Sequence, residues 1–336
     1  MCNSSNASQY SPNFSAGYSE NPEDQGINPY LGLELSTMPK LIDLKFLGLE
    51  EAIGAYLIES PEGPILIETG PHSTFDTLER SLNAYGYTAR DVQHVLLTHI
   101  HLDHAGAAWT FADQGARIYV HPFGKKHLSD PSVLMESARR IYQDKMDELW
   151  GDMRAISADQ IITPEDREEM TIGNQTFKAL YTPGHARHHI AWQYQDVVFC
   201  GDIAGVKIGN GPVVPPCPPP DINLEDWLDS INIVQNSGAK SIYLTHFGEI
   251  TEIDEHMEAL RSMLEDWANW VKVRWEASQS PEEMTPAFSA YTANQLREKG
   301  VDEAGVKRYE AANPSWMSVA GLIRYWKKTS TNLKKD

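Results

Sequence analysis

The segment LLTHIHLDHAG, at residues 96–106, constrains the fold and the chemistry of this chain more than any other stretch. It overlaps the short apolar run HVLLT at residues 94–98, a pattern that predicts a buried strand. Open α/β sheets place their functional sites at the carboxyl ends of strands. Where this strand ends, four side chains able to bind a metal follow within six residues, namely His99, His101, Asp103 and His104.

The spacing of these four residues predicts that they converge. An extended segment points alternate residues to one face, so His99, His101 and Asp103 are expected to face the same way. His104 comes where an alanine-rich stretch begins to turn helical. Crowded imidazoles repel one another when protonated, whereas a divalent metal ion holds them neutral. A lone histidine on a loop is usually a satisfied polar group, but this clustering favours a metal site.

The same arrangement recurs three times later in the chain, where an apolar strand-like run again ends close to a ligand-type residue. The runs and their residues are Phe177–Tyr181 with His185, Val197–Cys200 with Asp202, and Ser241–Leu244 with His246. A tetrahedral zinc ion needs three or four protein ligands, and a catalytic one keeps a position open for water. Each of these residues alone would more often be structural, but the repetition indicates that they complete the site.

Taken together, these segments resemble the metallo-β-lactamase-fold hydrolases, and most closely their glyoxalase II-like and lactonase-like branch. The matching segments, within about residues 40–265, are ILIETG (65–70), THIHLDHAG (98–106), TPGHARHH (182–189), CGD (200–202) and THFG (245–248). The resemblance implies an α/β fold of the αββα sandwich type, in which two mixed sheets are flanked by helices. It also implies that His99, His101 and His185 hold one metal ion, that Asp103, His104 and His246 hold a second, and that Asp202 bridges them.

The resemblance also suggests residues that support the ligands. Glu68 stands where the family usually has an aspartate that supports the site without ligating it, so the carboxylate is kept but its reach is changed. His189 matches a position where the family often has a histidine behind the ligands. His188 replaces the usual small residue there and faces either the pocket or solvent.

The expected chemistry is hydrolysis by two divalent ions, with zinc favoured and iron or manganese as alternatives. Two ions about 3.5–4 Å apart deprotonate a water at neutral pH and clamp a carbonyl oxygen. We expect Asp103 to be catalytic, receiving or orienting the proton of that water while it ligates. The alternatives are an iron-dependent oxygenase or redox enzyme, a β-lactam hydrolase and a non-catalytic binding protein. Retention of all seven ligands favours the hydrolase, and none of the three cysteines has the context of a nucleophile.

Composition narrows the substrate. The chain carries 28 basic and 47 acidic residues, for a formal charge of -19, so nucleic acid and anionic membranes are unexpected partners. We expect a small, partly apolar ester, thioester or lactone. The candidate pocket residues are Tyr142, Trp150, Arg187 and Lys207. The first two belong to a helical stretch predicted over 130–150, which either faces the core or forms a wall over the metals. The proline-rich loop GNGPVVPPCPPP, at 209–220, either shapes the pocket or only connects elements.

The pattern along the chain predicts three parts. Residues 1–36 are rich in polar residues, glycine and proline and predict a flexible arm. Residues 37–274 carry the motifs and form the catalytic domain. Residues 275–336 predict a helical extension, which could pack on the sheet, cover the site or form a contact in a homo-oligomer. No apolar stretch suits a secretory signal or a membrane span, so a cytoplasmic location is expected.

Overall fold

The apolar runs of the first half of the chain form one mixed sheet in the computed structural model, which describes residues 38–332. The expected flexible arm, residues 1–36, lies outside this range. The six strands lie in chain order. The first strand pairs antiparallel with the second and the second with the third, whereas the third to sixth strands all run parallel. They are β1 (Lys40–Asp43), β2 (Gly54–Ile58), β3 (Ile65–Ile67), β4 (His94–Leu96), β5 (Arg117–Tyr119) and β6 (Ile161–Ile162).

The middle of the chain forms a second mixed sheet of six strands, in the order β12-β11-β10-β9-β8-β7. Its strands pair antiparallel except for β10 and β11, which run parallel. The strands are β7 (Glu169–Ile172), β8 (Gln175–Tyr181), β9 (Ile190–Tyr194), β10 (Val197–Phe199), β11 (Ser241–Leu244) and β12 (Gly248–Ile250). In the parallel pairs β3–β4 and β10–β11, the carboxyl ends of neighbouring strands lie at the same edge of the sheet, and the candidate ligands follow these ends.

The two sheets pack face to face through one buried apolar layer. Its side chains come from both sheets, for example Tyr56 and Leu96 from the first and Trp192 and Phe199 from the second, all less than 2% exposed. The rings of Tyr56 and Phe199 lie 5.3 Å apart between their centroids. Burial of this layer against water is the main force that joins the sheets.

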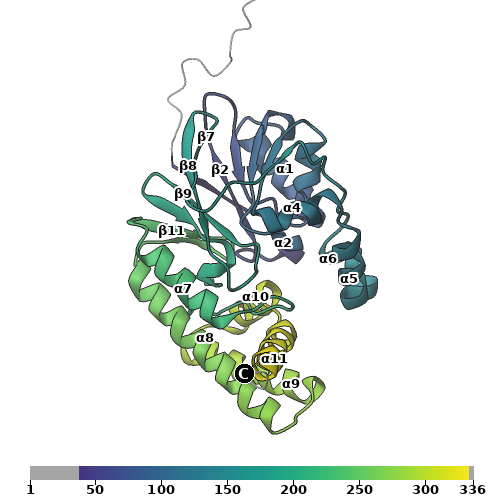
Figure 1. Ribbon diagram of the computed structural model, residues 1–336, viewed down its shortest axis with the longest axis vertical. Helices are drawn as coiled ribbons and strands as arrows, with labels where there is room; N and C mark the ends of the chain where they lie inside the picture. Colours follow the sequence, from purple (N-terminus) through teal and green to yellow (C-terminus); the bar gives the residue numbers. More distant parts are fainter. Residues whose placement is uncertain (1–37, 333–336) are drawn as a thin grey trace, which may run out of the picture. The chain divides into compact units, whose positions relative to one another are not determined.

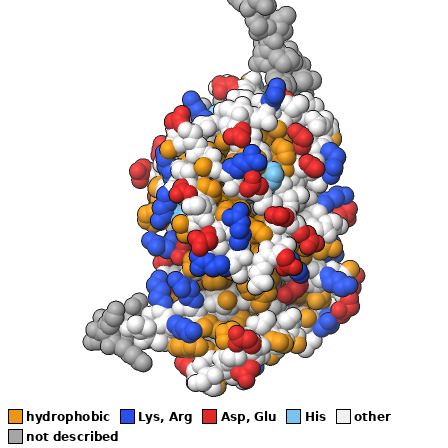
Figure 2. Space-filling model, turned by 90° about the vertical axis from the view of Figure 1, so that its right-hand side faces the viewer, with side chains coloured by type: hydrophobic (Ala, Val, Ile, Leu, Met, Phe, Trp, Pro, Cys, Tyr) orange, Lys and Arg blue, Asp and Glu red, His pale blue; other side chains and the backbone are white. Residues whose placement is uncertain are grey.

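Helices cover the outer face of the first sheet (Figure 1). The helices of this part of the chain are α1 (Phe75–Ala84), α2 (Leu102–Ala105), α3 (Ala108–Ala112), α4 (Pro122–Ser129), α5 (Ser132–Tyr142) and α6 (Met146–Leu149), of which α5 and α6 project away from the sheet. The single helix expected over 130–150 is therefore wrong, because Gln143 takes a left-handed φ of 49° that ends α5. Short 3-10 turns are η1 (Phe46–Gly48), η2 (His72–Thr74), η3 (Ala89–Asp91), η4 (Gln143–Lys145) and η5 (Gly201–Ala204). On the face that these helices present, charges of both signs are interspersed with apolar side chains (Figure 2).

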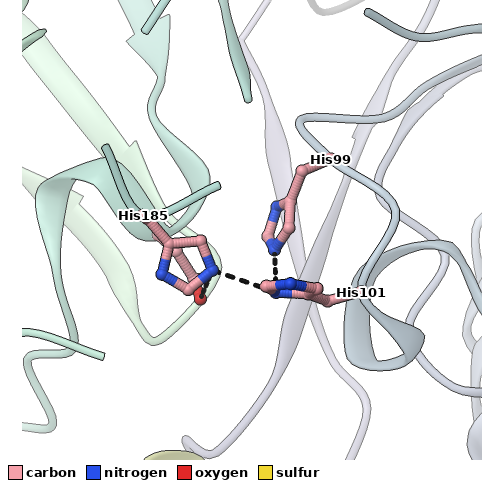
Figure 3. A group of neighbouring side chains, drawn as sticks. His99, His101 and His185 are labelled. Atoms are coloured by element: carbon pink, nitrogen blue, oxygen red, sulfur yellow. Dashed lines mark hydrogen bonds and ion pairs between the residues drawn. The ribbon is translucent and has the colours of Figure 1, made fainter. Parts of the chain in front are cut away.

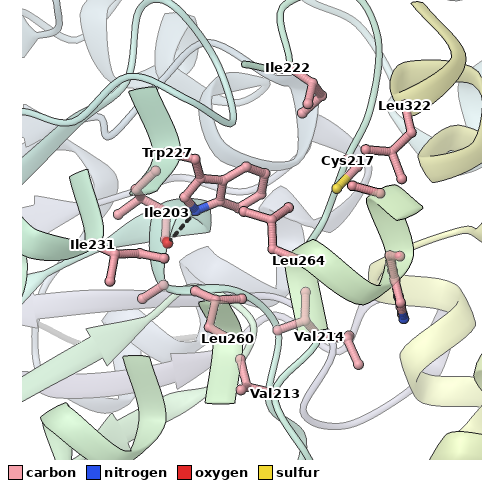
Figure 4. Close-up of a cluster of buried hydrophobic side chains, with 14 of the residues drawn as sticks. Ile203, Val213, Val214, Cys217, Ile222, Trp227, Ile231, Leu260, Leu264 and Leu322 are labelled. Carbon is pink, nitrogen blue, oxygen red and sulfur yellow. Dashed lines mark hydrogen bonds between the residues drawn. The ribbon is translucent and has the colours of Figure 1, made fainter. Parts of the chain in front are cut away.

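Five further helices lie on the side of the second sheet (Figure 1). They are α7 (Leu224–Gln235), α8 (Ile253–Glu276), α9 (Pro281–Glu298), α10 (Glu303–Ala312) and α11 (Ser315–Asn332). The extension expected after residue 274 packs through α11 against α8 and α9. Its Leu322 shares a buried cluster with Trp227 of α7 and Leu264 of α8 (Figure 4). Two sheets between two helical layers confirm the predicted αββα sandwich with C-terminal helices. Within residues 38–332, no helix combines the length and the apolarity that a bilayer crossing requires.

Candidate metal centre

The seven candidate ligands meet at one edge of the sandwich, where strands of both sheets end. His99 and His101 follow β4, while Asp103 and His104 lie on the short helix α2. The second sheet contributes the other three: His185 from the loop after β8, Asp202 from η5 after β10, and His246 directly after β11. Figure 3 shows His185 reaching across from the second sheet toward His99 and His101. The sheets thus bring together residues that are up to 147 positions apart, from 99 to 246.

One group of ligand atoms surrounds a single point. The Nε2 atom of His99 lies 2.8 Å from Nδ1 of His101, and Nε2 of His185 lies 3.0 Å from that same Nδ1. Oδ2 of Asp202 lies 3.3 Å from Nε2 of His185. Four ligands at the corners of a tetrahedron with ~2.0 Å bonds are ~3.3 Å apart. These four residues therefore have the spacing of a metal site.

A second group lies beside the first and shares Asp202 with it. Nε2 of His104 lies 3.6 Å from Oδ2 of Asp103, and Nε2 of His246 lies 3.5 Å from that same oxygen. Oδ1 of Asp202 lies 3.2 Å from Nε2 of His104 and 3.4 Å from Nε2 of His246. Because one carboxylate oxygen faces each group, Asp202 occupies a bridging position between them.

Partners behind the rings fix which nitrogen faces the centre. Nδ1 of His185 donates to the carbonyl oxygen of Pro216 at 2.8 Å, and Nδ1 of His246 donates to the carbonyl oxygen of Ala52 at 2.6 Å. With the proton on Nδ1, the lone pair of Nε2 points inward in both rings. Such partners are typical of metal-binding histidines, and because every residue has a backbone carbonyl, no sequence motif marks these two.

Glu68 contacts two residues of the motif that contains His99 and His104. Its carboxylate accepts hydrogen bonds from the hydroxyl and the backbone N–H of Thr98, and its Oε1 lies 3.2 Å from Nδ1 of His104. The side chain is only 1% exposed, and the residue adopts a left-handed φ of 63°. The Glu68 carboxylate therefore lies beside Nδ1 of His104, and with His99 and His104 it also forms a group whose atoms are close enough to hold a cation.

Buried acceptors without a partner show that the residues fit a cation. In the described part of the chain, Nε2 of His104, Nε2 of His246 and Oδ1 of Asp202 are buried, and although the two nitrogens lie 3.2 and 3.4 Å from that oxygen they form no well-aligned hydrogen bond. Leaving a buried polar atom unsatisfied costs about 1–3 kcal/mol. All three atoms face the shared centre, where divalent cations would satisfy them.

The protonation of the cluster reflects the same arrangement. Burial lowers the pKa of His101 to about 3, and burial also holds the pKa of His99 well below its usual value. Burial would lower the pKa of His104 too, but the carboxylates of Asp202 and Asp103 outweigh it and raise this pKa. Burial would raise the pKa of Asp103, yet His104 and His246 bring it down to about 2. The carboxylates therefore attract positive charge to the centre, and metal binding there would release protons.

His188 and His189 both lie inside the molecule beside the ligands. His188 is 7% exposed, and its ring centroid lies 5.7 Å from that of His101, so it faces the interior and not the solvent. His189 is fully buried, and its Nδ1 lies 2.8 Å from the hydroxyl of Thr182. Both rings pack behind the candidate ligands.

A cavity of about 480 Å³ opens at the centre, and His101, Asp103 and Asp202 line it. Tyr142 and Trp150 line it, together with other residues of α5, so this stretch forms a wall of the pocket. Prolines 216 and 218–220 line it too, which assigns the proline-rich loop to the pocket.

Two expected pocket residues lie elsewhere. Arg187 does not line this cavity; it is exposed, and its guanidinium lies 5.4 Å from the ring centroid of Phe123. Lys207 lines a separate cavity beside α8. Both residues are close in sequence to a motif, yet neither of them lines the cavity that contains Asp103 and Asp202.

Sequence reasoning missed the lining contributed by Phe46 and Leu47 of η1 and by Trp316 and Met317 of α11. No motif marks these residues. The only usable signal was the amphipathic pattern of the last helix, which predicts packing but not the partner.

Comparisons with known proteins find one matching family model and several similar chains. A family model described as the Metallo-beta-lactamase superfamily matches residues 51–246. The metallo-beta-lactamase fold-containing protein ST1585 of Sulfurisphaera tokodaii is 30% identical over 177 residues, which cover 51% of this chain and 67% of the relative. The probable metallo-hydrolase YqjP of Bacillus subtilis is 24% identical, covering 62% and 72%. The atrochrysone carboxyl ACP thioesterase of Aspergillus fumigatus is 23% identical, covering 68% and 66%.

Solved structures share the architecture. The crystal structure of ST1585 superposes with a TM-score of 0.54 at 25% identity, covering 66% of this chain and 86% of that one. The metallo-beta-lactamase family protein TTHA1429 of Thermus thermophilus superposes with a TM-score of 0.55 at 21% identity, covering 83% and 89%. The second likeness concerns the fold alone.

Proposed function

The chain belongs to the metallo-beta-lactamase superfamily, and on this basis we propose that it is a metal-dependent hydrolase of small, partly apolar esters, thioesters or lactones. The observation that carries this proposal is the pair of ligand groups that share Asp202, with inward-facing acceptors that lack partners. We assign His99, His101 and His185 to one divalent ion, Asp103, His104 and His246 to a second, and zinc to both positions. The narrower likeness to the glyoxalase II-like and lactonase-like branch stays a prediction.

Two such ions would polarise a substrate carbonyl and would lower the pKa of a water enough to make hydroxide available at neutral pH. The chain's own residues provide the rest. Asp103 lines the cavity and its side chain is 21% exposed, so its carboxylate is within reach of a substrate or a water. It orients a water and takes up its proton. The apolar walls exclude bulk solvent from the reacting carbonyl, which strengthens every electrostatic contact there.

The names of two relatives support a hydrolase. One is named a probable metallo-hydrolase and another a carboxyl ACP thioesterase, and thioester cleavage lies within the class proposed here. A small molecule suits the 480 Å³ cavity, since ligand sites are typically ~300–1,000 Å³.

The test begins with elemental analysis of protein purified without added metal, which should find two zinc ions per chain. A panel of esters, thioesters, lactones and a β-lactam then follows on the wild type and on His101→Ala, which should lose turnover and at least one metal. His94→Ala is the matched control, because His94 lies at the opposite end of the same strand β4 and should keep both. Iron together with oxygen uptake, or no turnover in a zinc-replete sample, would overturn the proposal.

A further inference from the structure

The cavity beside the metal centre has few charged side chains that could pair with a charged ligand. Apart from Asp103 and Asp202 at the metal end, its charged lining residues are Lys145 and Glu310. The Glu310 carboxylate is already engaged, because it accepts hydrogen bonds from the backbone N–H and the hydroxyl of Ser315 at 3.0 and 2.6 Å. Lys145 is exposed to solvent. A charged group in the interior of the cavity would therefore be desolvated without a partner, which is costly.

The remaining wall is apolar, and aromatic rings join its separate parts. Phe46 of η1 stacks on Trp150 at 5.7 Å between ring centroids, Trp150 meets Tyr142 of α5 at 5.1 Å, and Tyr142 meets Trp316 of α11 at 6.0 Å. The Tyr142 hydroxyl also donates to the sulfur of Met317 at 3.4 Å. One row of rings thus runs from the catalytic domain to the C-terminal extension.

The metal end and the aromatic row divide the cavity into two functional parts. The reacting carbonyl must lie at Asp103 and Asp202, where the ligands are. The group attached to it then extends along the row toward α11, where Trp316 and Met317 are only partly buried and can exchange solvent for a ligand. The proline-rich loop limits the width, because four of its prolines line the same space and proline has little freedom to move.

We propose that the aromatic row and the start of α11 form a compartment for a bulky, uncharged apolar acyl group, whose size is set by Trp316 and Met317. This inference rests on the proposed hydrolase function, which it narrows to substrates with an apolar acyl part. It gives the C-terminal extension a role in substrate selection. Each methylene that enters the compartment raises kcat/KM about fourfold, from ~0.8 kcal/mol per buried methylene, until the space is filled.

The first experiment measures kcat/KM for esters with one leaving group and straight acyl chains from acetyl to decanoyl. We expect a steep rise with chain length in the wild type. In Trp316→Ala the values for long chains should fall about tenfold or more, while the acetyl ester changes little. Trp326→Ala is the matched control, since Trp326 is also on α11 but does not line the cavity, and its profile should follow the wild type. A flat profile in the wild type, or an equal loss for all chain lengths in Trp316→Ala, would overturn the inference.

The second experiment needs no turnover. The neutral fluorophore N-phenyl-1-naphthylamine brightens in apolar sites, and its Kd is measured on the wild type, Trp316→Ala, Trp326→Ala and His246→Ala. His246 ligates in the proposal but does not line the cavity, so His246→Ala should bind the probe like the wild type, whereas Trp316→Ala should bind it about tenfold more weakly. An equal Kd in wild type and Trp316→Ala contradicts the compartment. Probe binding that depends on Trp316 without any hydrolysis supports the compartment and contradicts only the hydrolase.

Discussion

The Nδ1 atom of His185 donates a 2.8 Å hydrogen bond to the carbonyl oxygen of Pro216, and Pro216 lies in a loop that the C-terminal helices hold in place. Asn313 donates to the carbonyl of Pro215 at 3.1 Å, and the hydroxyl of Ser318 accepts from the backbone N–H of Cys217 at 3.4 Å. Helices far outside the ligand motifs therefore set the orientation of a candidate metal ligand.

This bracing predicts that Gly321→Ala destabilises the protein. In a helix interior this change is normally stabilising by about 1 kcal/mol. Here the added Cβ would overlap the carbonyl oxygen of Cys217, so we expect a loss of about 1–3 kcal/mol and weaker zinc binding. Urea unfolding and zinc competition with a chelator measure the two effects. Ala290→Gly, at an exposed site of α9, should show the ordinary propensity loss alone. A more stable Gly321→Ala protein would contradict the close packing.

Tyr309 supports the other end of the same loop. Its hydroxyl donates to the carbonyl of Pro212 at 2.7 Å and accepts from the backbone N–H of Ile208 at 3.0 Å, and the residue is 3% exposed. Tyr309→Phe leaves both groups without this partner, so the free energy of unfolding should fall by about 1–3 kcal/mol. Tyr85→Phe, at a residue that is 40% exposed, should change it by less than about 0.5 kcal/mol. Equal unfolding curves for the two variants would refute this role.

Glu68 should tune metal affinity without touching the metal. Glu68→Gln removes the negative charge behind His104, which makes the imidazole a poorer ligand, and we expect zinc to bind about 10–100-fold more weakly. Glu68→Asp keeps the charge but has a shorter side chain, so its zinc affinity should lie between those of the wild type and Glu68→Gln. Chelator competition measures all three proteins. The exposed Glu62→Gln serves as control, and a Glu68→Gln protein with the control's affinity would show that the charge is not needed.

Protonation of His121 should lower the free energy of unfolding in acid. Its Nδ1 accepts from the backbone N–H of Phe123 at the start of α4, and burial lowers its pKa to about 4 although Asp166 raises it. Between pH ~6.5 and ~4 the unfolded chain therefore binds the proton more readily, and the free energy of unfolding falls as the pH falls through this window. His121→Asn keeps a capping acceptor and cannot titrate. Comparing zinc-saturated proteins at pH 7.5 and 5, we expect the variant to lose about 1–2 kcal/mol less than the wild type. The same loss in both would rule out His121 as a source of the acid sensitivity.

Much of the fold and of the candidate site could be predicted from the sequence, because the signals are local. His99, His101, Asp103 and His104 lie within six residues after a strand, and the distant His185, Asp202 and His246 each follow an apolar run. Short-range periodicity determines which segments become strands, and strands that end at one edge bring their following residues together.

Tertiary structure alone decided what surrounds those ligands. No sequence pattern marks the residue Gln143 at which the helix ends. The contacts of His185 with Pro216, of His246 with Ala52 and of Tyr142 with Trp316 join segments that share no sequence pattern. Which apolar faces meet depends on packing over the whole core, and a carbonyl that orients a ligand has the same chemistry in every residue. The sequence by itself thus determined the strands and the identity of the candidate ligands, whereas the lining of the cavity arose only when the C-terminal helices packed beside them.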